Sequence, residues 1–245
     1  MEMMQHNYDP LLVGLSYVIS VLGSFTALRL CRQHAGAVGA EKWRSLFAGA
    51  LAMGAGAIWA MHFIGMLAFH VGMPIAYDIP ITLASLLVAV AVTGFGIYIV
   101  GKGPTKPLRL IGAGLAMGLG VASMHYTGMA AMRMQARLSY DLTIVGISLV
   151  IAVVASIAAL WLVFNTTRLW QMIASALVMG LAVCGMHYTG MKAAIMQHDP
   201  SLPALTAGLS PEILAYVIFL VTLMILSLAS LLTGSRPAIQ VRRAA

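Results

Sequence analysis

Three short segments of the sequence carry the residues whose types and spacing could do chemistry. Each segment has a histidine directly preceded by methionine, with a glycine three residues and a second methionine four residues after it. In a helix, a histidine and a methionine four residues later share one face. Imidazole beside a thioether is a donor set for a soft or borderline metal, so this pattern predicts a metal site. The segments read Met61-His62-Phe63-Ile64-Gly65-Met66, Met124-His125-Tyr126-Thr127-Gly128-Met129 and Met186-His187-Tyr188-Thr189-Gly190-Met191.

The candidate ligands are the motif histidines and the methionine that follows each of them by one turn. Thioether ligands favour Cu(I), whereas imidazole alone suits zinc, copper, iron or nickel. Copper is therefore the predicted metal, and zinc, iron and haem remain open. The predicted ligand residues are His62, His125, His187, Met66, Met129 and Met191.

Other side chains of the motif have two readings each. The hydroxyls of Tyr126 and Tyr188 are candidate cofactor-binding groups, either as partners of the metal ligands or as aromatic residues at the outer interface. Cys184, one turn before His187, could add a thiolate, but the other two segments have no counterpart. Methionine is a common gap-filler in protein cores, and a lone intramembrane histidine is more typical of a hydrogen-bonded core residue. Three copies of one motif favour a functional site, because burying ionisable groups in a membrane is costly.

The rest of the sequence indicates that the motifs lie inside a membrane. The chain is 61% hydrophobic and 9% charged, whereas soluble domains carry about 25% charged residues. Seven stretches reach the roughly 20 apolar residues that a membrane-spanning helix needs. We therefore predict an all-α integral membrane protein, a seven-helix bundle. The predicted spans are approximately residues 11–30, 46–69, 80–100, 108–131, 142–164, 169–194 and 212–233.

Basic residues in the loops predict the orientation of these spans. Eleven of the 14 Lys and Arg residues follow the first, third, fifth or seventh span. The positive-inside rule then places the N-terminus outside and the C-terminus in the cytoplasm. The net charge of +7 is explained by these loops and the C-terminal tail, so we predict the lipid bilayer as partner and no nucleic acid. All three motif-bearing spans run outward, which places the histidines at one depth in the outer half of the membrane.

The motifs belong to a longer internal repeat. Their histidines are 63 and 62 residues apart, and a Met-Gly pair precedes each one: Met53-Gly54, Met117-Gly118 and Met179-Gly180. An internal period of this length indicates stacked copies of one supersecondary unit. We predict three repeated helical hairpins plus a seventh helix. The glycine between His and Met removes side-chain bulk, so a neighbouring helix can approach closely.

At these residues the sequence resembles the MHYT family of bacterial integral membrane sensory domains. The family is named for the tetrapeptide that occurs here as Met124-His125-Tyr126-Thr127 and Met186-His187-Tyr188-Thr189. The resemblance covers essentially the whole chain. It implies a seven-transmembrane sensor domain at residues 1–235 in the bacterial inner membrane, and a short basic cytoplasmic tail at residues 236–245. The first motif departs from the family pattern, because Phe63 and Ile64 lack the phenol and the hydroxyl.

The resemblance also implies a function. Members are proposed to sense a diatomic gas (oxygen, carbon monoxide or nitric oxide) through a metal, commonly suggested to be copper. Many members continue into cytoplasmic signalling output domains, so we expect such a domain or partner. The chain is then either a stand-alone version or the sensor module of a longer protein.

Three classes of function fit the motif. The first is a sensor, without enzymatic activity, that detects a diatomic gas, copper or redox state. The second is a membrane-embedded zinc hydrolase, whose carboxylate base would have to come from the outer loops, from Asp78, Asp141 or Asp199. The third is a copper carrier or channel, which needs a series of sites through the membrane. The inner halves of the motif spans offer methionines such as Met53, Met117 and Met179, but no histidine. The sensor is the prediction that we carry forward.

Overall fold

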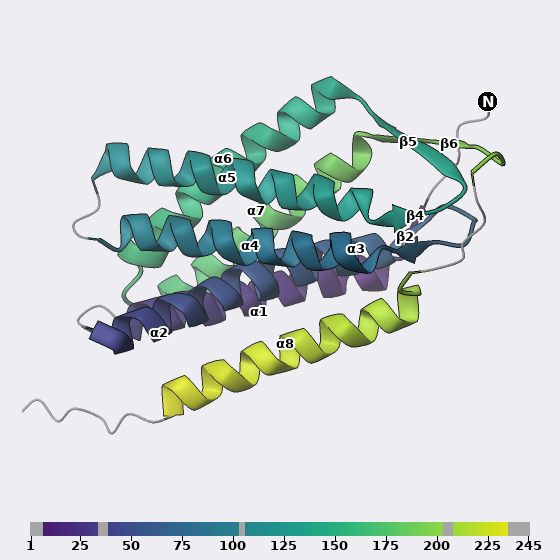
Figure 1. Ribbon diagram of the computed structural model, residues 1–245. Coiled ribbons are helices and arrows are strands. Elements are labelled where there is room, and N and C mark those ends of the chain that lie inside the picture. The colour runs from purple at the N-terminus through teal and green to yellow at the C-terminus, as the bar shows by residue number, and fades with distance from the viewer. Residues whose placement is uncertain (1–6, 34–38, 103–105, 203–207, 235–245) are drawn as a thin grey trace, which may run out of the picture.

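The computed structural model describes residues 7–33, 39–102, 106–202 and 208–234, so the predicted tail at 236–245 lies outside the described residues. Within these ranges the protein is a bundle of long helices that run side by side (Figure 1). Five uninterrupted helices are long and apolar enough to cross a membrane, and a sixth such span contains the first motif. The five are α1 (Pro10–Gln33), α4 (Ile79–Val100), α5 (Pro107–Ala130), α6 (Leu142–Asn165) and α7 (Leu169–Lys192).

The span with the first motif is built from three consecutive helical segments, α2 (Gly39–Ala50), η1 (Leu51–Ala60) and α3 (Met61–Leu67). It begins several residues before the predicted start at residue 46. In its most apolar stretch 89% of the residues are buried, against 33% to 39% in the other five spans. The other helices therefore surround this span, which is the centre of the bundle.

The last helix, α8 (Pro211–Gly234), lies at the edge of the bundle, where Figure 1 draws it in yellow. Its apolar stretch Pro211–Ile225 is shorter than a full span among the residues whose side chains are described. The seventh span therefore stays a prediction. The structure shows a multi-pass helical membrane protein with six candidate spans.

The segment η1 is a π-helix, and it accommodates one extra residue in the first repeat. The sequence Leu-Ala-Met-Gly occurs at both 51–54 and 115–118, yet Met53 precedes its histidine by nine residues and Met117 by eight. A π-helix forms i→i+5 bonds, so it winds more residues into each turn than an α-helix does. The additional residue is absorbed within η1, and His62 keeps a position on the bundle axis equivalent to that of His125. The Met-Gly pairs indicate the repeat but do not predict this difference in spacing.

Three aspartates tie the ends of the motif helices to the beginnings of other helices. Asp9, Asp78 and Asp141 cap α1, α4 and α6, because each carboxylate accepts hydrogen bonds from backbone N–H groups of the first turn. The backbone N–H of each aspartate also donates to a carbonyl just after a motif helix, at 2.8–2.9 Å. These bonds run from Asp9 to Ala68, from Asp78 to Ala131 and from Asp141 to Ala193. All three motif helices therefore end at the same level of the bundle.

Short antiparallel strand pairs close this end, an addition to the predicted all-α architecture. The pairs are β1 (Asn7–Tyr8) with β2 (Phe69–His70), β3 (Ala76–Tyr77) with β4 (Met132–Arg133), and β5 (Ala136–Tyr140) with β6 (Ala194–His198). Each pair satisfies backbone groups of loops that leave the helices. The strands therefore hold the loops over the ends of the motif helices.

The backbone of η1 lies so close to Gly23 of α1 that a larger residue there would be destabilising. A Cβ at Gly23 would lie 2.4 Å from the backbone nitrogen of Ala57, whereas a Cβ at Gly14 on the same helix meets nothing within 4 Å. We expect Gly23→Ala to lower the free energy of unfolding by about 1–3 kcal/mol, as overpacking does. Gly14→Ala should leave it unchanged or raise it by up to about 1 kcal/mol, because alanine favours the helix. Thermal unfolding of the detergent-solubilised variants checks this, and equal midpoints for the two variants would contradict it.

Candidate metal centre

The motif histidines meet at one buried point in the bundle. His62 on α3, His125 on α5 and His187 on α7 are each no more than 1% exposed. The Nδ1 atom of His62 lies 3.0 Å from that of His187 and 3.1 Å from that of His125. The three candidate ligand atoms all lie within 4.8 Å of one another. The rings are nearly perpendicular to one another, with interplanar angles of 77° to 87°, so each pair packs edge to face.

These three rings cannot satisfy one another by hydrogen bonding. A neutral imidazole has one N–H, and each ring nitrogen is either a donor or an acceptor but not both. His62 Nδ1 contacts the Nδ1 atoms of both His125 and His187, but it has only one proton to donate or one lone pair to accept with, so it cannot complete both hydrogen bonds. The Nε2 atoms of the same residues are also buried, without a hydrogen-bond partner in the described part of the chain. Unsatisfied polar atoms in apolar surroundings are unfavourable, and a cation that accepts the Nδ1 lone pairs would relieve part of this cost.

The spacing of the nitrogens suits one metal ion. Imidazole nitrogens bind zinc at about 2.0–2.1 Å, which separates three of them in one plane by roughly 3.5 Å. The two Nδ1 separations of 3.0 and 3.1 Å are slightly shorter. Small outward movements of the rings would therefore be enough for His62, His125 and His187 to hold one ion.

The glycine of each motif makes room for the histidine of a neighbouring motif. A Cβ at each of these glycines would lie 2.2–2.3 Å from an Nε2 atom, far closer than any normal contact. Gly65 faces His187, Gly128 faces His62 and Gly190 faces His125. The sequence predicted that these glycines allow close helix approach. The structure shows the specific reason: each glycine accommodates an imidazole ring of the site.

The aromatic residue after each histidine packs edge-on against that histidine, with ring centroids 4.8 Å apart in all three motifs. The hydroxyl of Tyr126 bonds to Ser148 Oγ on α6 at 2.7 Å, and that of Tyr188 bonds to Ser16 Oγ on α1 at 3.0 Å. Both phenols are therefore hydrogen-bonded to outer helices. These bonds fix the rings of Tyr126 and Tyr188 beside His125 and His187. The predicted role of Tyr126 and Tyr188 in cofactor binding stays a prediction.

The first motif lacks the phenol, and a different residue replaces it. Ser85 on α4 is the counterpart of Ser16 and Ser148, since each serine follows a capping aspartate by seven residues. Its hydroxyl accepts a hydrogen bond of 3.1 Å from the indole N–H of Trp59. Trp59 lies one turn before Phe63 and packs against its ring, with centroids 4.9 Å apart. Sequence reasoning missed these serines, although the recurrence of Tyr-Asp with serine seven residues after the aspartate was a signal.

Three further tyrosines cover the motif aromatics from the strand end of the bundle. They precede the capping aspartates, and their ring centroids lie 5.4–6.0 Å from those of the motif residues. Tyr8 covers Tyr188, Tyr77 covers Phe63 and Tyr140 covers Tyr126. Burial raises the pKa of Tyr8 and of Tyr140 to about 12, helped in each case by the neighbouring motif tyrosine, and burial raises the pKa of Tyr77 as well. The cover over the site is therefore uncharged at neutral pH.

The other predicted ligands lie in the core. Met66, Met129 and Met191 are each no more than 1% exposed, one turn beyond the histidine of their own motif. The prediction that their sulfur atoms bind the metal stays a prediction. Cys184 is also buried and forms no disulfide. In the described part of the chain, one cluster of His, Cys, Asp or Glu side chains could hold a metal ion, and its members are the three histidines.

The outer-loop carboxylates are engaged elsewhere. Asp78 and Asp141 cap helices, and Asp78 also pairs with Arg133, whose hydrogen bond lowers the pKa of the carboxyl. Asp199 accepts hydrogen bonds from Ser201 and pairs with Arg137, and these contacts lower its pKa to about 2. None of these three aspartates is therefore placed to act beside the histidines as the general base that a hydrolase would need.

The glycine contacts give a test of the site with a control on the same helix. Gly190→Ala would place a methyl group against His125 Nε2, whereas a Cβ at Gly185 meets nothing within 4 Å. We expect Gly190→Ala to displace the ring and to lower metal affinity at least tenfold, by analogy with the loss of partners that orient metal ligands. Gly185→Ala should bind metal as the wild type does. Competitive metal titration of the purified variants measures both affinities, and equal affinities would contradict the assignment.

Comparison with known proteins finds three consecutive copies of one sequence repeat, each with one of these histidines. The family model of MHYT, the bacterial signalling protein N-terminal repeat, matches residues 56–113, 118–176 and 180–244. The chain is 41% identical over 232 residues to the bifunctional diguanylate cyclase/cyclic di-GMP phosphodiesterase MucR of Pseudomonas aeruginosa, covering 93% of this chain and 34% of that protein. It is 38% identical over 204 residues to the cyclic di-GMP phosphodiesterase NbdA of the same organism, covering 80% of this chain and 26% of that protein.

A third relative is the signaling protein YkoW of Bacillus subtilis, 32% identical over 238 residues that are 94% of this chain and 29% of that protein. The chain thus spans about a third or less of the length of these relatives. No solved structure matches it. The family model covers most of the chain in three consecutive copies, and each copy includes one of the three histidines. The chain therefore belongs to the MHYT family of bacterial signalling proteins.

Proposed function

We propose that this chain is a membrane sensory domain whose three histidines hold a metal ion. The observation that carries the proposal is the buried meeting of His62, His125 and His187, in which the Nδ1 atom of His62 lies 3.0 Å from that of His187 and 3.1 Å from that of His125. A buried polar cluster without internal partners needs an explanation, and a bound ion supplies one. A bound metal would supply an open coordination position for a diatomic gas such as oxygen, carbon monoxide or nitric oxide, or would itself report copper or redox state.

Copper is the metal that the donors favour. Three imidazoles with methionines nearby form a borderline-to-soft set, which suits copper better than magnesium or calcium. Met66, Met129 and Met191 would supply thioethers from the turn beyond the histidines. Zinc and iron use imidazole as well. A haem with two axial histidines fits less well, because iron at about 2 Å from each nitrogen would need axial nitrogens roughly 4 Å apart with a flat macrocycle between them.

Tyr126 and Tyr188 act on the site through the histidines in this proposal. Their hydroxyls are held by Ser148 and Ser16, and their rings lie edge-on against the adjacent histidines. They would thus orient the imidazoles and exclude water from the outer side. In the first motif, Phe63 does this with the support of Trp59.

The proposed architecture is three helical hairpins plus a seventh span formed by α8. The equivalent aspartate caps and the three consecutive family matches support three repeats. The N-terminus would be outside and the C-terminus in the cytoplasm of a bacterium, across its inner membrane. This orientation follows from the basic loops. The ion pairs of Arg133 with Asp78 and of Arg137 with Asp199 fit it, because they neutralise two of the three basic residues at the outer end.

The signal would leave through α8. A Cβ on Gly56 of η1 would lie 3.6 Å from the side chain of Ile225 of α8, so α8 packs beside the span that carries His62. A shift of that span on ligand binding would be transmitted along α8 to the cytoplasmic side. The relatives named as a diguanylate cyclase and cyclic di-GMP phosphodiesterases suggest the kind of output domain that the chain would regulate.

The proposal is tested first by elemental analysis of the purified protein, under conditions that preserve Cu(I). We expect about one metal ion per chain in the wild type, because three imidazoles form one shared site. The variants His62→Ala, His125→Ala and His187→Ala should each lose the metal. His198→Ala, in the exposed end of β6, is the matched control and should retain it. A metal-free wild type would contradict the proposal that the protein binds a metal. Metal retained in all three motif variants would contradict the proposal that the three histidines share one ion.

The gas-sensing step needs a separate measurement. Optical and vibrational spectra of the metal-loaded protein should change on addition of carbon monoxide or nitric oxide, because an ion held by three imidazoles has a further coordination position, which the gas would take in place of a motif methionine. The three histidine variants should show no change. Spectra that do not respond to any of the gases, from protein with full metal content, would restrict the function to copper or redox sensing.

A further inference from the structure

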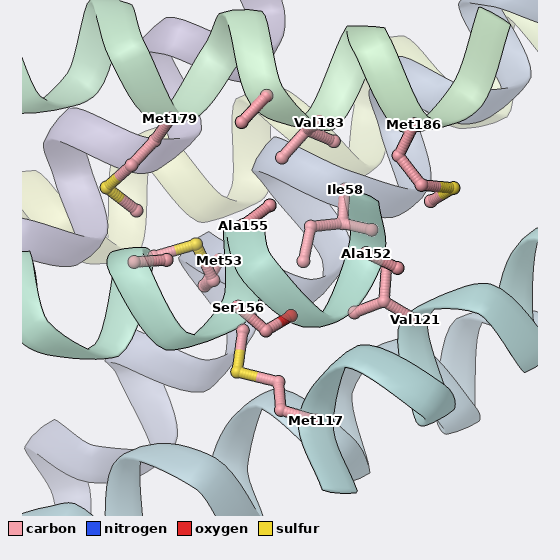
Figure 2. A pocket seen from close by; sticks show the side chains of 12 residues that line it. Met53, Ile58, Met117, Val121, Ala152, Ala155, Ser156, Met179, Val183 and Met186 are labelled. Atoms are coloured by element: carbon pink, nitrogen blue, oxygen red, sulfur yellow. The ribbon is translucent and has the colours of Figure 1, made fainter. Parts of the chain in front are cut away.

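A cavity of about 30 Å³ lies inside the bundle, between the three motif spans and α6. Figure 2 shows its side chains converging from η1, α5, α6 and α7. The lining is apolar apart from the hydroxyl of Ser156. It consists of Met53, Ile58, Met117, Val121, Ala152, Ala155, Ser156, Ala159, Met179, Ala182, Val183 and Met186.

The cavity has a fixed relation to the histidines in every repeat. Ile58, Val121 and Val183 each lie four residues before the motif histidine, on the same face of the helix. Four residues of helix correspond to about 6 Å. Met53, Met117 and Met179 lie about one turn further along and also line the space. The cavity therefore lies about one helical turn from the histidine cluster, on the side away from the motif methionines Met66, Met129 and Met191, and α6 closes it laterally.

The size and the lining determine what this cavity can hold. One water molecule needs roughly 10–15 Å³ and several polar partners, and an apolar cavity stays dry. A charged or strongly polar ligand would have to give up its hydration without compensation. The occupant that fits is a small, uncharged, apolar molecule.

The lining of the cavity is most exposed where α6 and α7 meet. Ala155 on α6 and Ala182 and Val183 on α7 are half-buried, whereas the other residues of the lining are buried. The opening thus lies between α6 and α7, and two alanines make its sides small. Apolar gases dissolve better in hydrocarbon than in water, so the bilayer is the source from which such a cavity would fill.

We propose that this space is a docking cavity for a diatomic gas, filled from the bilayer between α6 and α7, on the inner side of the histidine cluster. The inference rests on the proposed gas-sensing function and adds to it an entry route and a docking site for the gas. Ala155 and Ala182 control entry, and the layer of Ile58, Val121 and Val183 faces the histidines. The inner side of the histidine cluster is then the side on which gas arrives.

The docking site can be tested without any metal, by methyl NMR of metal-free protein in lipid nanodiscs. Methionine methyl groups are labelled, and their relaxation is measured with and without dissolved oxygen, which is paramagnetic. We expect the cavity methionines Met53, Met117, Met179 and Met186 to be relaxed by oxygen severalfold more than Met129 and Met191, which are equally buried but do not line the cavity. Equal effects in the two groups would overturn the proposal.

The entry route is tested with a pair of variants. Ala182→Leu should narrow the opening and remove most of the oxygen effect on the cavity methionines. Ala158→Leu is the control, because Ala158 is exposed on α6 and does not line the cavity. If Ala182→Leu does not fold, as judged by thermal unfolding, the smaller change Ala155→Val makes the same test. An unchanged oxygen effect in a folded opening variant would overturn the route.

A second readout uses the metal-loaded protein. Flash photolysis should show a slower association of carbon monoxide in Ala182→Leu, with unchanged metal content, and a wild-type rate in Ala158→Leu. The failures are distinguishable. Oxygen in the cavity of a protein that binds no gas at its metal would leave the cavity standing and refute gas sensing. Gas binding with rates that do not differ between the variants would refute the cavity's role and leave gas sensing standing.

Discussion

Three imidazole rings facing each other in a dry interior are the constraint around which this bundle is arranged. Each ring is buried, and the Nδ1 atom of His62 lies closer to those of His125 and His187 than two nitrogens around one ion would. Without an ion, no assignment of protons gives all the ring nitrogens a partner among the described residues. The motif glycines and aromatic residues pack directly against the rings in this arrangement.

Several features of the fold hold the three rings in position. The motif glycines provide the space into which the rings of neighbouring motifs fit. The motif aromatics hold the rings from the side, and two of these aromatics are themselves fixed by serines of the outer helices. The capping aspartates bring the ends of the motif helices to one level, and the π-helix compensates for the extra residue of the first repeat. Rings held on rigid helices by such contacts are pre-organised for binding, as functional sites require.

Much of this could be predicted from the sequence, and the reason is the repetition. Three copies of His-aromatic-x-Gly-Met on outward-running spans predict that His62, His125 and His187 lie at one depth, and the structure shows that they converge. The role of Gly65, Gly128 and Gly190 was only half predicted, because sequence spacing within a helix does not reveal which side chain of another helix a glycine faces. The replacement of a phenol by Trp59 was not predictable either. It depends on a contact between η1 and α4 that only the packing defines. The cavity beneath the histidines likewise arises from four elements that meet far apart in the sequence.

The most direct test of the central claim is X-ray absorption spectroscopy of the metal-loaded protein, purified from bacterial membranes. A site formed by the three histidines should give a first shell of three imidazole nitrogens at about 2.0–2.1 Å, with the multiple-scattering signal of the histidine rings. Added sulfur scattering would identify a motif methionine as a further ligand. A first shell without imidazole scattering, or one made of oxygen atoms alone, would contradict the claim that His62, His125 and His187 hold the metal.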